Sequence, residues 1–396
     1  MVTMASAFTM EVVGIIDIII YIDRINRMLP EDYFKTNLDK SYKVGEMSIL
    51  PIYFDSMGAK SMCTFIETPD IKILIDPGAA IMQPSYPLEE EEKEAFLEVA
   101  IERIKDYCKK ADVVIITHYH YDHHKKPSEL KEAYLGKKLY IKNPNKWINY
   151  SQWERARLLY EELILILDKS LRMNMLEKNP KMTVYRDPYE DLKLARQKDF
   201  GDYSERREEL LKKWRNRFFQ CRAMWRKEPW LKEFSVGNTE INFIKEGIIK
   251  FGKTEISFQK PFFHGIEYSK MGWVETVLIK YNGKKFFFSS DLHGPTIEDY
   301  AYLIIRENPD VIILDGPATY LLGYMLNRTN LNRIIENASR IVRECDFKLM
   351  IYDHHCLREK KFRERLKPFY ETVEETGKNV MTAAEYFGLK PLVELL

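Results

Sequence analysis

The sequence predicts an α/β protein in which helices cover β-sheet. Residues 48–78 hold short β-branched and aromatic runs separated by Gly, Ser and Pro-Asp punctuation, a pattern typical of two or three strands. Apolar residues recur at helical spacing over 87–110, and the run "DVVIIT" at 112–117 is then typical of a buried strand. This alternation of strands and helices favours a layered fold.

The composition allows a large hydrophobic core and shows no overall charge bias. The chain has 396 residues, of which 45% are hydrophobic and 13% aromatic, enough for one large domain or two ordinary ones. Lysine and arginine total 61 against 60 aspartate and glutamate, so the overall charge favours neither nucleic acid nor an acidic membrane surface. Any charged binding face must therefore be local.

The cysteine pattern indicates reduced thiols. A disulfide framework uses an even number of cysteines, whereas this chain has five, widely separated and without a CxxC pair: Cys63, Cys108, Cys221, Cys345 and Cys356. This usage predicts a cytoplasmic protein.

The N-terminal segment contains the apolar run "MEVVGIIDIIIYI", which is similar to part of a membrane anchor. Glu11 and Asp17 interrupt this run, and it is shorter than the roughly 20 residues needed to cross a bilayer. We therefore expect no membrane association. We interpret residues 1–46 as an extension formed by one helix that ends near "MLPED", and 47–396 as the main domain.

The helix predicted over 87–110 has signals at both ends. Pro87 stands at its start, acidic residues 89–92 complement the positive end of the helix dipole, and Lys109 and Lys110 complement the negative end. The strand at 112–117 follows directly and ends at His118. Catalytic groups of layered α/β proteins gather where strands end and loops begin, so His118 lies in a plausible place for a functional site.

Residues 116–124, "ITHYHYDHH", have the spacing of a metal site. On a loop that leaves a strand, His118 and His120 can point to one ion while Asp122 and His123 turn to a second. Imidazole nitrogen and carboxylate oxygen are ligands that zinc accepts, and two ions roughly 3.5 to 4 Å apart need ligands interleaved in this way. The alternative is a histidine-rich surface loop that binds nothing.

The distribution of all histidines favours the metal site. The eight histidines fall in four places, each beside a Gly or Asp at the end of an apolar run: 118–124, "ISFQKPFFHG" with His264, "KKFFFSSDLHGP" with Asp291 and His293, and "FKLMIYDHH" with His354 and His355. Histidines used for ordinary polar contacts would be scattered along the chain. We therefore expect a metal centre.

This ordered set of motifs resembles the metallo-β-lactamase superfamily. The resemblance covers residues 47 to about 360 and implies an αββα sandwich with metals at one edge of its two sheets. Its five motifs map in order onto Asp76, residues 118–123, His264, Asp291, and His354 or His355. A closer resemblance, to an archaeal branch of predicted hydrolases, rests on "FDSMGAKSM", "ITHYHYDHH", "NYSQWERAR", "SSDLHGP", "DGPATYLLGY" and "DHHCLRE".

The resemblance implies a role for each matching residue. His118, His120 and His264 would hold a first ion, Asp291 would bridge two ions, and a second ion would be held by Asp122, His123 and the histidine of the fifth motif. His354 and His355 both stay open, with a slight preference for His355, because a one-residue shift reverses the direction of a side chain. Asp76 would orient imidazoles.

Two histidines lie outside the superfamily pattern. His293 is a candidate proton donor to the leaving group, and a surface or supporting histidine is the alternative. For His124 the structural interpretation is favoured. The residues expected to act in catalysis are therefore Asp76, Asp122 and His293.

The implied chemistry is hydrolysis. Two divalent ions, zinc first and iron or manganese as alternatives, would present a bridging hydroxide to an ester, lactone or phosphodiester. The sequence contains no GxSxG nucleophile motif and no phosphate-binding P-loop that would suggest other chemistry. An iron-containing redox or sensing protein of the same fold is a further alternative.

Substrate residues are suggested by two segments. "NYSQWERAR" places Ser151, Gln152 and Arg155 at the start of a helix, where an anion can bind, although an ordinary capped helix has the same pattern. "VIILDGPATYLLGY" places a second set just past a buried strand, as a substrate wall or a structural turn: Asp315, Thr319 and Tyr320.

A charged, mostly helical insertion is expected at about 170–235. Its basic segment, 205–227, would either grip nucleic acid, which would indicate a nuclease on RNA or DNA, or pack an aromatic stripe against the domain. We favour packing. The oligomeric state stays undetermined.

Overall fold

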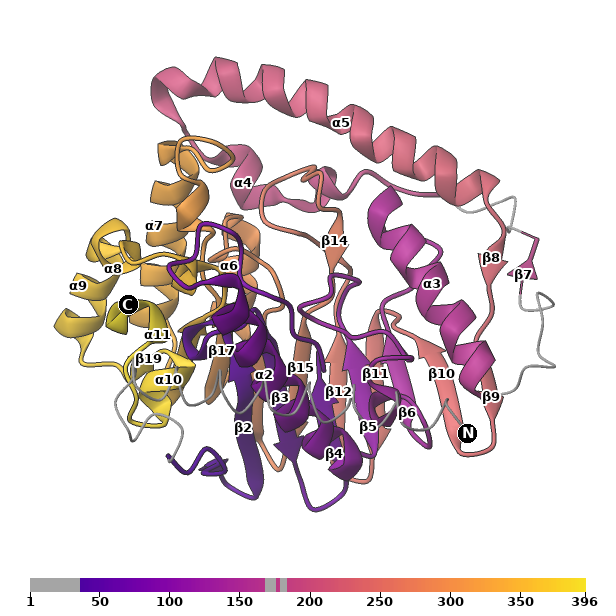
Figure 1. The fold of residues 1–396 in the computed structure, drawn as a ribbon. Helices are drawn as coiled ribbons and strands as arrows, with labels where there is room; N and C mark the ends of the chain where they lie inside the picture. Colours follow the sequence, from indigo (N-terminus) through magenta and orange to yellow (C-terminus); the bar gives the residue numbers. More distant parts are fainter. Residues whose placement is uncertain (1–35, 168–175, 179–183) are drawn as a thin grey trace.

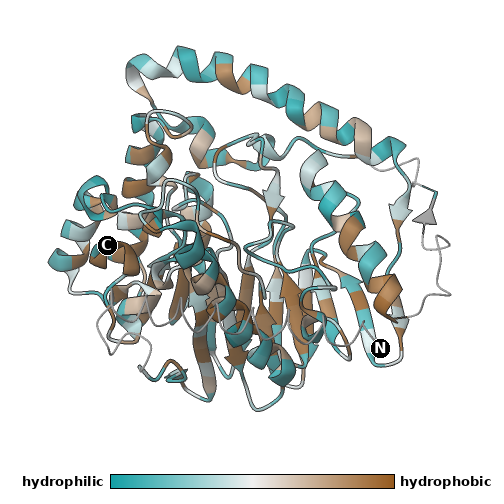
Figure 2. Cartoon of the chain, viewed as in Figure 1, coloured by the Kyte–Doolittle hydropathy of each residue, from teal (hydrophilic) through white to brown (hydrophobic). Residues whose placement is uncertain are grey.

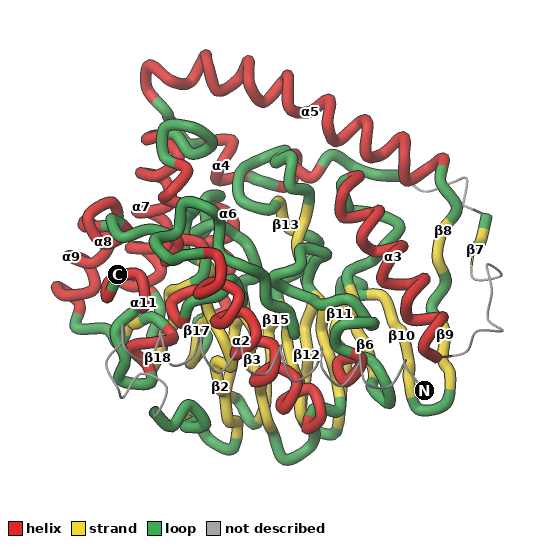
Figure 3. The backbone as a smooth tube through the Cα atoms, viewed as in Figure 1, coloured by secondary structure: helices red, strands yellow, loops and turns green. Residues whose placement is uncertain are grey.

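The computed structural model describes residues 36–167, 176–178 and 184–396. The helix expected within the N-terminal extension lies outside these residues. Two large β-sheets and the helices around them form most of the described chain (Figure 1). The tube in Figure 3 shows long loops gathered at one end of the strands.

The first sheet has eight strands, and six of them, β1 to β6, come from the N-terminal half of the chain. Its order is β1 (Tyr42–Val44), β2 (Met47–Phe54), β3 (Met62–Glu67), β4 (Lys72–Ile75), β5 (Val113–Ile116), β6 (Lys138–Ile141), β10 (Thr239–Phe243) and β9 (Phe234–Val236). Strands β4, β5, β6 and β10 are parallel, and the flanking pairs are antiparallel. Residues 48–78 thus form three strands, at the upper end of the predicted number.

The second sheet has seven strands from the C-terminal half. Its order is β11 (Gly247–Phe251), β12 (Thr254–Phe258), β15 (Val277–Tyr281), β16 (Lys284–Phe288), β17 (Val311–Asp315), β18 (Leu349–Asp353) and β19 (Val380–Met381). Strands β16 to β19 are parallel, so the ends of β16, β17 and β18 meet at one edge.

Helices cover the sheets and confirm the predicted αββα sandwich. Helix α2 (Glu90–Lys110) contacts β2 and β4, whereas α6 (Glu298–Glu307), α7 (Arg328–Glu344) and α9 (Lys367–Thr376) pack together beside the second sheet. Strand β17 shows why its sequence is continuously apolar: Val311 and Ile313 join the larger hydrophobic cluster, and Ile312 and Leu314 join the cluster with these helices. Figure 2 shows the apolar strands between more polar helices.

The helix predicted over 87–110 is α2, which begins three residues after Pro87. The carboxylate of Glu92 accepts a hydrogen bond from the backbone N–H of Glu89 at 3.0 Å, and this contact sets the helix start. The remaining elements are α3 (Tyr150–Leu167), β7 (Leu176–Glu177), α4 (Lys193–Gln197), α5 (Ser204–Lys227), β8 (Trp230–Leu231), β13 (Phe262–Phe263), β14 (Trp273–Val274), α8 (Phe362–Arg365), α10 (Ala383–Tyr386) and α11 (Leu392–Leu395).

The predicted insertion contains α4 and α5. Leu211, Phe218 and Trp225 on α5 are buried, and the ring of Trp225 lies 5.3 Å from that of Trp147. The aromatic stripe of α5 therefore packs on the domain. Among the described helices, none is long and apolar enough to cross a membrane.

Candidate metal centre

The candidate site lies where strands end. Asp76 directly follows β4, His118 follows the end of β5 by two residues, and His354 directly follows β18. Asp291 comes three residues after β16, and His264 directly follows the short strand β13. Parallel strands present their carboxyl ends at the same edge, so side chains that are distant in sequence meet there.

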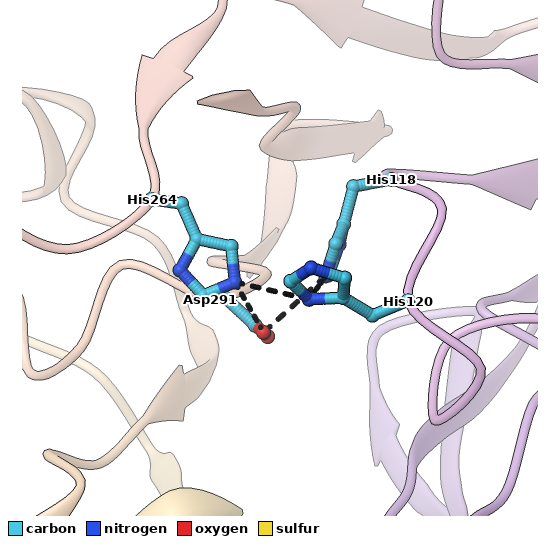
Figure 4. A group of neighbouring side chains, drawn as sticks. All are labelled: His118, His120, His264 and Asp291. Carbon is cyan, nitrogen blue, oxygen red and sulfur yellow. Dashed lines mark hydrogen bonds and ion pairs between the residues drawn. The ribbon is translucent and has the colours of Figure 1, made fainter. Parts of the chain in front are cut away.

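Three imidazoles and one carboxylate oxygen form a first donor group (Figure 4). His118 Nε2 lies 3.1 Å from His120 Nδ1, and His264 Nε2 lies 3.3 Å from the same His120 atom. Asp291 Oδ2 lies 3.3 Å from His118 Nε2 and 3.0 Å from His264 Nε2. Four donor atoms thus converge on one point.

The other oxygen of Asp291 faces a second donor group, formed with Asp122, His123 and His354. Asp291 Oδ1 lies 3.0 Å from His123 Nε2 and 3.6 Å from His354 Nε2. His354 Nε2 is 3.8 Å from Asp122 Oδ2. Asp291 therefore stands between the two groups, and His354 rather than His355 lies beside Asp122 and His123.

These residues fit the binding of divalent cations. His123 Nε2 and both carboxylate oxygens of Asp291 are buried and have no hydrogen-bond partner within the described part of the chain. Buried polar atoms without partners are costly, and a cation between the groups would satisfy them. The mixture of imidazole nitrogen and carboxylate oxygen suits zinc, iron or manganese.

Carboxylates on the far side of two imidazoles hold their rings. Asp76 Oδ2 lies 2.8 Å from His123 Nδ1, and Asp76 also accepts hydrogen bonds from the backbone N–H and the hydroxyl of Thr117 at 2.7 and 2.6 Å. Asp55 Oδ1 lies 2.8 Å from His354 Nδ1. In both cases the Nε2 atom is directed towards the donor groups, the arrangement common for metal-binding histidines.

Burial and charge set the protonation of these histidines without a metal. Burial lowers the pKa of His120 to about 3 and holds the pKa of His118 well below its usual value. Burial would also lower the pKa of His354, but the Asp55 carboxylate raises it to about 9. His118 and His120 therefore present neutral nitrogen atoms at neutral pH, the form that binds metal.

The backbone around the site is strained. Four residues other than glycine have positive φ angles here: Asp76 at 50°, Ser290 at 51°, His293 at 52° and His354 at 72°. Such conformations cost about 1–3 kcal/mol each and cluster where function requires them. The backbone of Gly78 lies against the backbone of the His124 segment. A Cβ atom added to Gly78 would lie 2.1 Å from the backbone nitrogen of His124.

His293, Asp315 and His355 form a third cluster beside the donor groups. Asp315 Oδ1 lies 2.8 Å from His355 Nδ1, and Asp315 Oδ2 accepts a hydrogen bond from the backbone N–H of His293 at 2.9 Å. The rings of His293 and His355 are 4.4 Å apart. His293 Nε2 is buried and lacks a hydrogen-bond partner among residues that the structure describes.

The remaining residues suggested for substrate differ in burial and contacts. Gln152 is buried, accepts a hydrogen bond from the backbone N–H of Tyr119 at 3.3 Å, and donates one to the carbonyl of Met271 at 2.7 Å. Arg155 donates to the carbonyl of Tyr119 at 3.4 Å. Ser151 is exposed, while Thr319 and Tyr320 begin a turn that contacts the turn at His355–Arg358.

Two residues near the donor groups were not predicted. Asp55 Oδ2 accepts a hydrogen bond from Arg358 Nε at 2.5 Å, and Arg358 Nη2 lies 3.1 Å from Asp122 Oδ2. Both lie in motifs that carry the archaeal resemblance, "FDSMGAKSM" and "DHHCLRE". The sequence motifs therefore pointed to these two segments but did not predict the contact between Asp55 and Arg358.

Comparison with known proteins finds a family model and solved structures that are similar to this chain. The family model for the metallo-beta-lactamase superfamily matches residues 58–144, which include the H-x-H-x-D-H motif. This match shows that residues 58–144 are similar to the metallo-β-lactamase superfamily. A solved structure of the metallo-beta-lactamase fold protein YhfI from Bacillus subtilis is 12% identical, with a TM-score of 0.39, over 85% of this chain and 96% of that chain.

Curated relatives place the chain more narrowly. It is 31% identical to the UPF0282 protein of Korarchaeum cryptofilum over 347 residues, covering 87% of this chain and 91% of that protein. It is also 31% identical to the UPF0282 protein of Methanocaldococcus jannaschii, covering 83% of this chain and 91% of that protein. The chain belongs to the UPF0282 family, to which these archaeal proteins also belong.

Proposed function

We propose that this protein is a metal-dependent hydrolase with a dinuclear centre. The observation that supports it most is the position of Asp291, whose two buried oxygens face two separate donor groups and have no hydrogen-bond partner among the described residues. The first ion would be held by His118, His120 and His264, the second by Asp122, His123 and His354, with Asp291 between them. Zinc is the expected metal.

Bound divalent ions supply a nucleophile at neutral pH and polarise the scissile group. The protein positions the donors: Asp76 and Asp55 hold the rings of His123 and His354 through their Nδ1 atoms. His293 Nε2 is buried and has no hydrogen-bond partner in the described chain, so it is the candidate to contact the leaving group. Burial holds the pKa of His293 well below its usual value, so it could act as a proton donor only after taking up a proton in the loaded site. His355, held by Asp315, lies beside it.

The substrate is proposed to be a small ester, lactone or phosphodiester. Its alternative, a nucleic acid bound by α5, finds less support because several basic side chains of α5 already contact the protein. Arg207 pairs with Glu267 at 2.6 Å, and Arg215 pairs with Asp187 at 2.5 Å. Salt-dependent binding of RNA or DNA would support the nuclease.

Elemental analysis of protein purified without added metal tests the proposal. We expect about two zinc ions per chain and a marked loss in Asp291→Ala. Asp310→Ala is the matched control, because Asp310 pairs with Lys284 at 2.9 Å at the start of β16 and lies away from the donor groups. An iron content would favour the redox or sensing alternative, and the absence of metal from the unaltered protein would refute the dinuclear hydrolase.

A further inference from the structure

His264 differs from His123 and His354 in how its ring is held. Carboxylates contact the Nδ1 atoms of His123 and His354 at 2.8 Å. His264 Nδ1 is buried, and no described residue forms a hydrogen bond with it. Its position therefore depends on its backbone, where the N–H of His264 donates to the carbonyl of Gly272 at 3.0 Å.

The backbone of His264 belongs to a loop, residues 264–272. The two strands that flank this loop form a sheet of their own and are not strands of the two large sheets. The loop joins β13 and β14, which pair with each other through only two residues each. The loop extends away from the sheets towards α5 (Figure 1). Loop 264–272 therefore needs support from other elements.

Helix α5 contacts this loop at two residues and the strand that follows it at one. Near the start of α5, Arg207 Nη2 lies 2.6 Å from Glu267 Oε1, and in its middle Arg217 donates to the carbonyl of Tyr268 at 3.1 Å. Near its end, Trp225 packs on Trp273, just after the loop, at 5.4 Å between ring centroids. These contacts cover about 27 Å of helix at about 1.5 Å per residue.

Glu267 also joins α5 to the main body of the domain. Arg333 of α7 lies 2.8 Å from Glu267 Oε1 and 2.7 Å from Glu298 Oε2 of α6. Glu267 and Arg333 are each 2% exposed. The loop is thus tied through one buried carboxylate to both α5 and α7.

Gln152 holds the loop near its C-terminal end, at Met271. Its amide donates to the carbonyl of Met271 and accepts from the backbone N–H of Tyr119, which lies between His118 and His120. This side chain therefore links loop 264–272 to the segment that carries the other two imidazoles of the first donor group.

We propose that α5 is a brace that positions His264 against His118 and His120. The inference rests on the proposed metal centre, and it gives the insertion a structural role in that centre. Arg207 and Arg217 are the positioning residues of the brace. Contacts around metal ligands typically change metal affinity about 10- to 100-fold when they are removed.

The test compares two charge-matched double variants. Arg207→Met with Arg217→Met removes both polar contacts and keeps the aliphatic stems, whereas Arg206→Met with Lys213→Met alters two exposed residues of the same helix. Zinc titration should show about 10- to 100-fold weaker binding of one ion in the first variant only, with the second ion retained. The same pair of substitutions added to His264→Ala should cause no further loss.

Amide hydrogen exchange of residues 264–272 in metal-stripped protein gives a readout that needs no metal. The brace predicts faster exchange there in Arg207→Met with Arg217→Met than in the control. Equal zinc binding or equal exchange in the two double variants overturns the brace. If the unaltered protein binds no zinc, the proposed function is refuted. The comparison of amide exchange between the two double variants is then the test of the brace.

The double variant Arg207→Met with Arg217→Met loses a buried ion pair and could fail to fold. If the double variant does not fold, Arg217→Met alone replaces it, because Glu267 then keeps both of its arginines. Loss of both ions together, in parallel with a lower unfolding midpoint, would show general destabilisation and would also overturn the proposal.

Discussion

Replacing Asp55 with asparagine should weaken both the fold and the proposed second metal site. Asp55 is fully buried and accepts hydrogen bonds from Arg358 Nε at 2.5 Å and from the backbone N–H of Ser61 at 2.9 Å. It also contacts His354 Nδ1 at 2.8 Å. An asparagine has one acceptor oxygen and an NH₂ group, so it cannot serve all three donors.

The magnitude follows from the burial of the ion pair. Breaking a buried pair by removing one partner costs about 3–5 kcal/mol. For a chain of 396 residues, an unfolding entropy of about 2.1 cal/mol/K per residue converts this cost into a fall of about 4–6 °C in the unfolding midpoint. Since His354 loses the carboxylate that orients its ring, the affinity for one ion should fall about 10- to 100-fold.

Thermal unfolding and zinc titration measure the two effects. Asp39→Asn is the control, because Asp39 also pairs with an arginine, Arg103, at 3.0 Å, but its side chain is 65% exposed. Exposed pairs contribute about 0–1 kcal/mol, so this variant should unfold within about 1 °C of the unaltered protein. Similar midpoints and similar zinc affinities in the two variants would refute the reasoning.

Three further predictions follow from the structure. Gly78→Ala should abolish metal binding, because its Cβ atom would lie 2.1 Å from the backbone nitrogen of His124, whereas at Gly136 nothing lies within 4 Å of the added atom; metal content of the two variants compares them, and equal content would contradict the prediction. A chain that begins at Met47 should fold and keep its metal but unfold at a lower temperature than one that begins at Thr36, because it lacks β1 and the contacts of Asp39; loss of solubility would show that residues before 47 cover part of the core. Chelation should lower the unfolding midpoint, since each ion present at 100 times its dissociation constant stabilises the fold by about 2.7 kcal/mol, and an unchanged midpoint would argue against bound metal.

Much of the site could be anticipated because its donors follow a local rule. Each lies at or shortly after the end of an apolar strand, and the strand ends of a parallel sheet share one edge. The spacing in residues 118–123 also separates two donor groups on a single loop. These relations involve only near neighbours in sequence and the apolar pattern of strands, so the motifs and the layered fold were predictable.

The choice between His354 and His355 was not predictable from the sequence. Both follow β18, and the positive φ angle of His354, 72°, turns the chain so that its ring joins Asp122 and His123. His355 instead contacts Asp315 at 2.8 Å. The geometry supports His354 as the donor beside Asp122 and His123, but His355 Nε2 lies 3.9 Å from Asp291 Oδ2, so both histidines remain candidates.

The sequence by itself determined the sandwich, the residue types of the metal centre and the amphipathic nature of α5. Only the tertiary structure decided what holds those donors in place: Asp55 meets His354 across 299 positions in the chain, and Arg207 of α5 meets Glu267 across 60. The physical reason is that strand and helix patterns follow from the periodicity of neighbouring residues, whereas the contacts of a buried charge depend on which distant loops the packed sheets bring to the same edge.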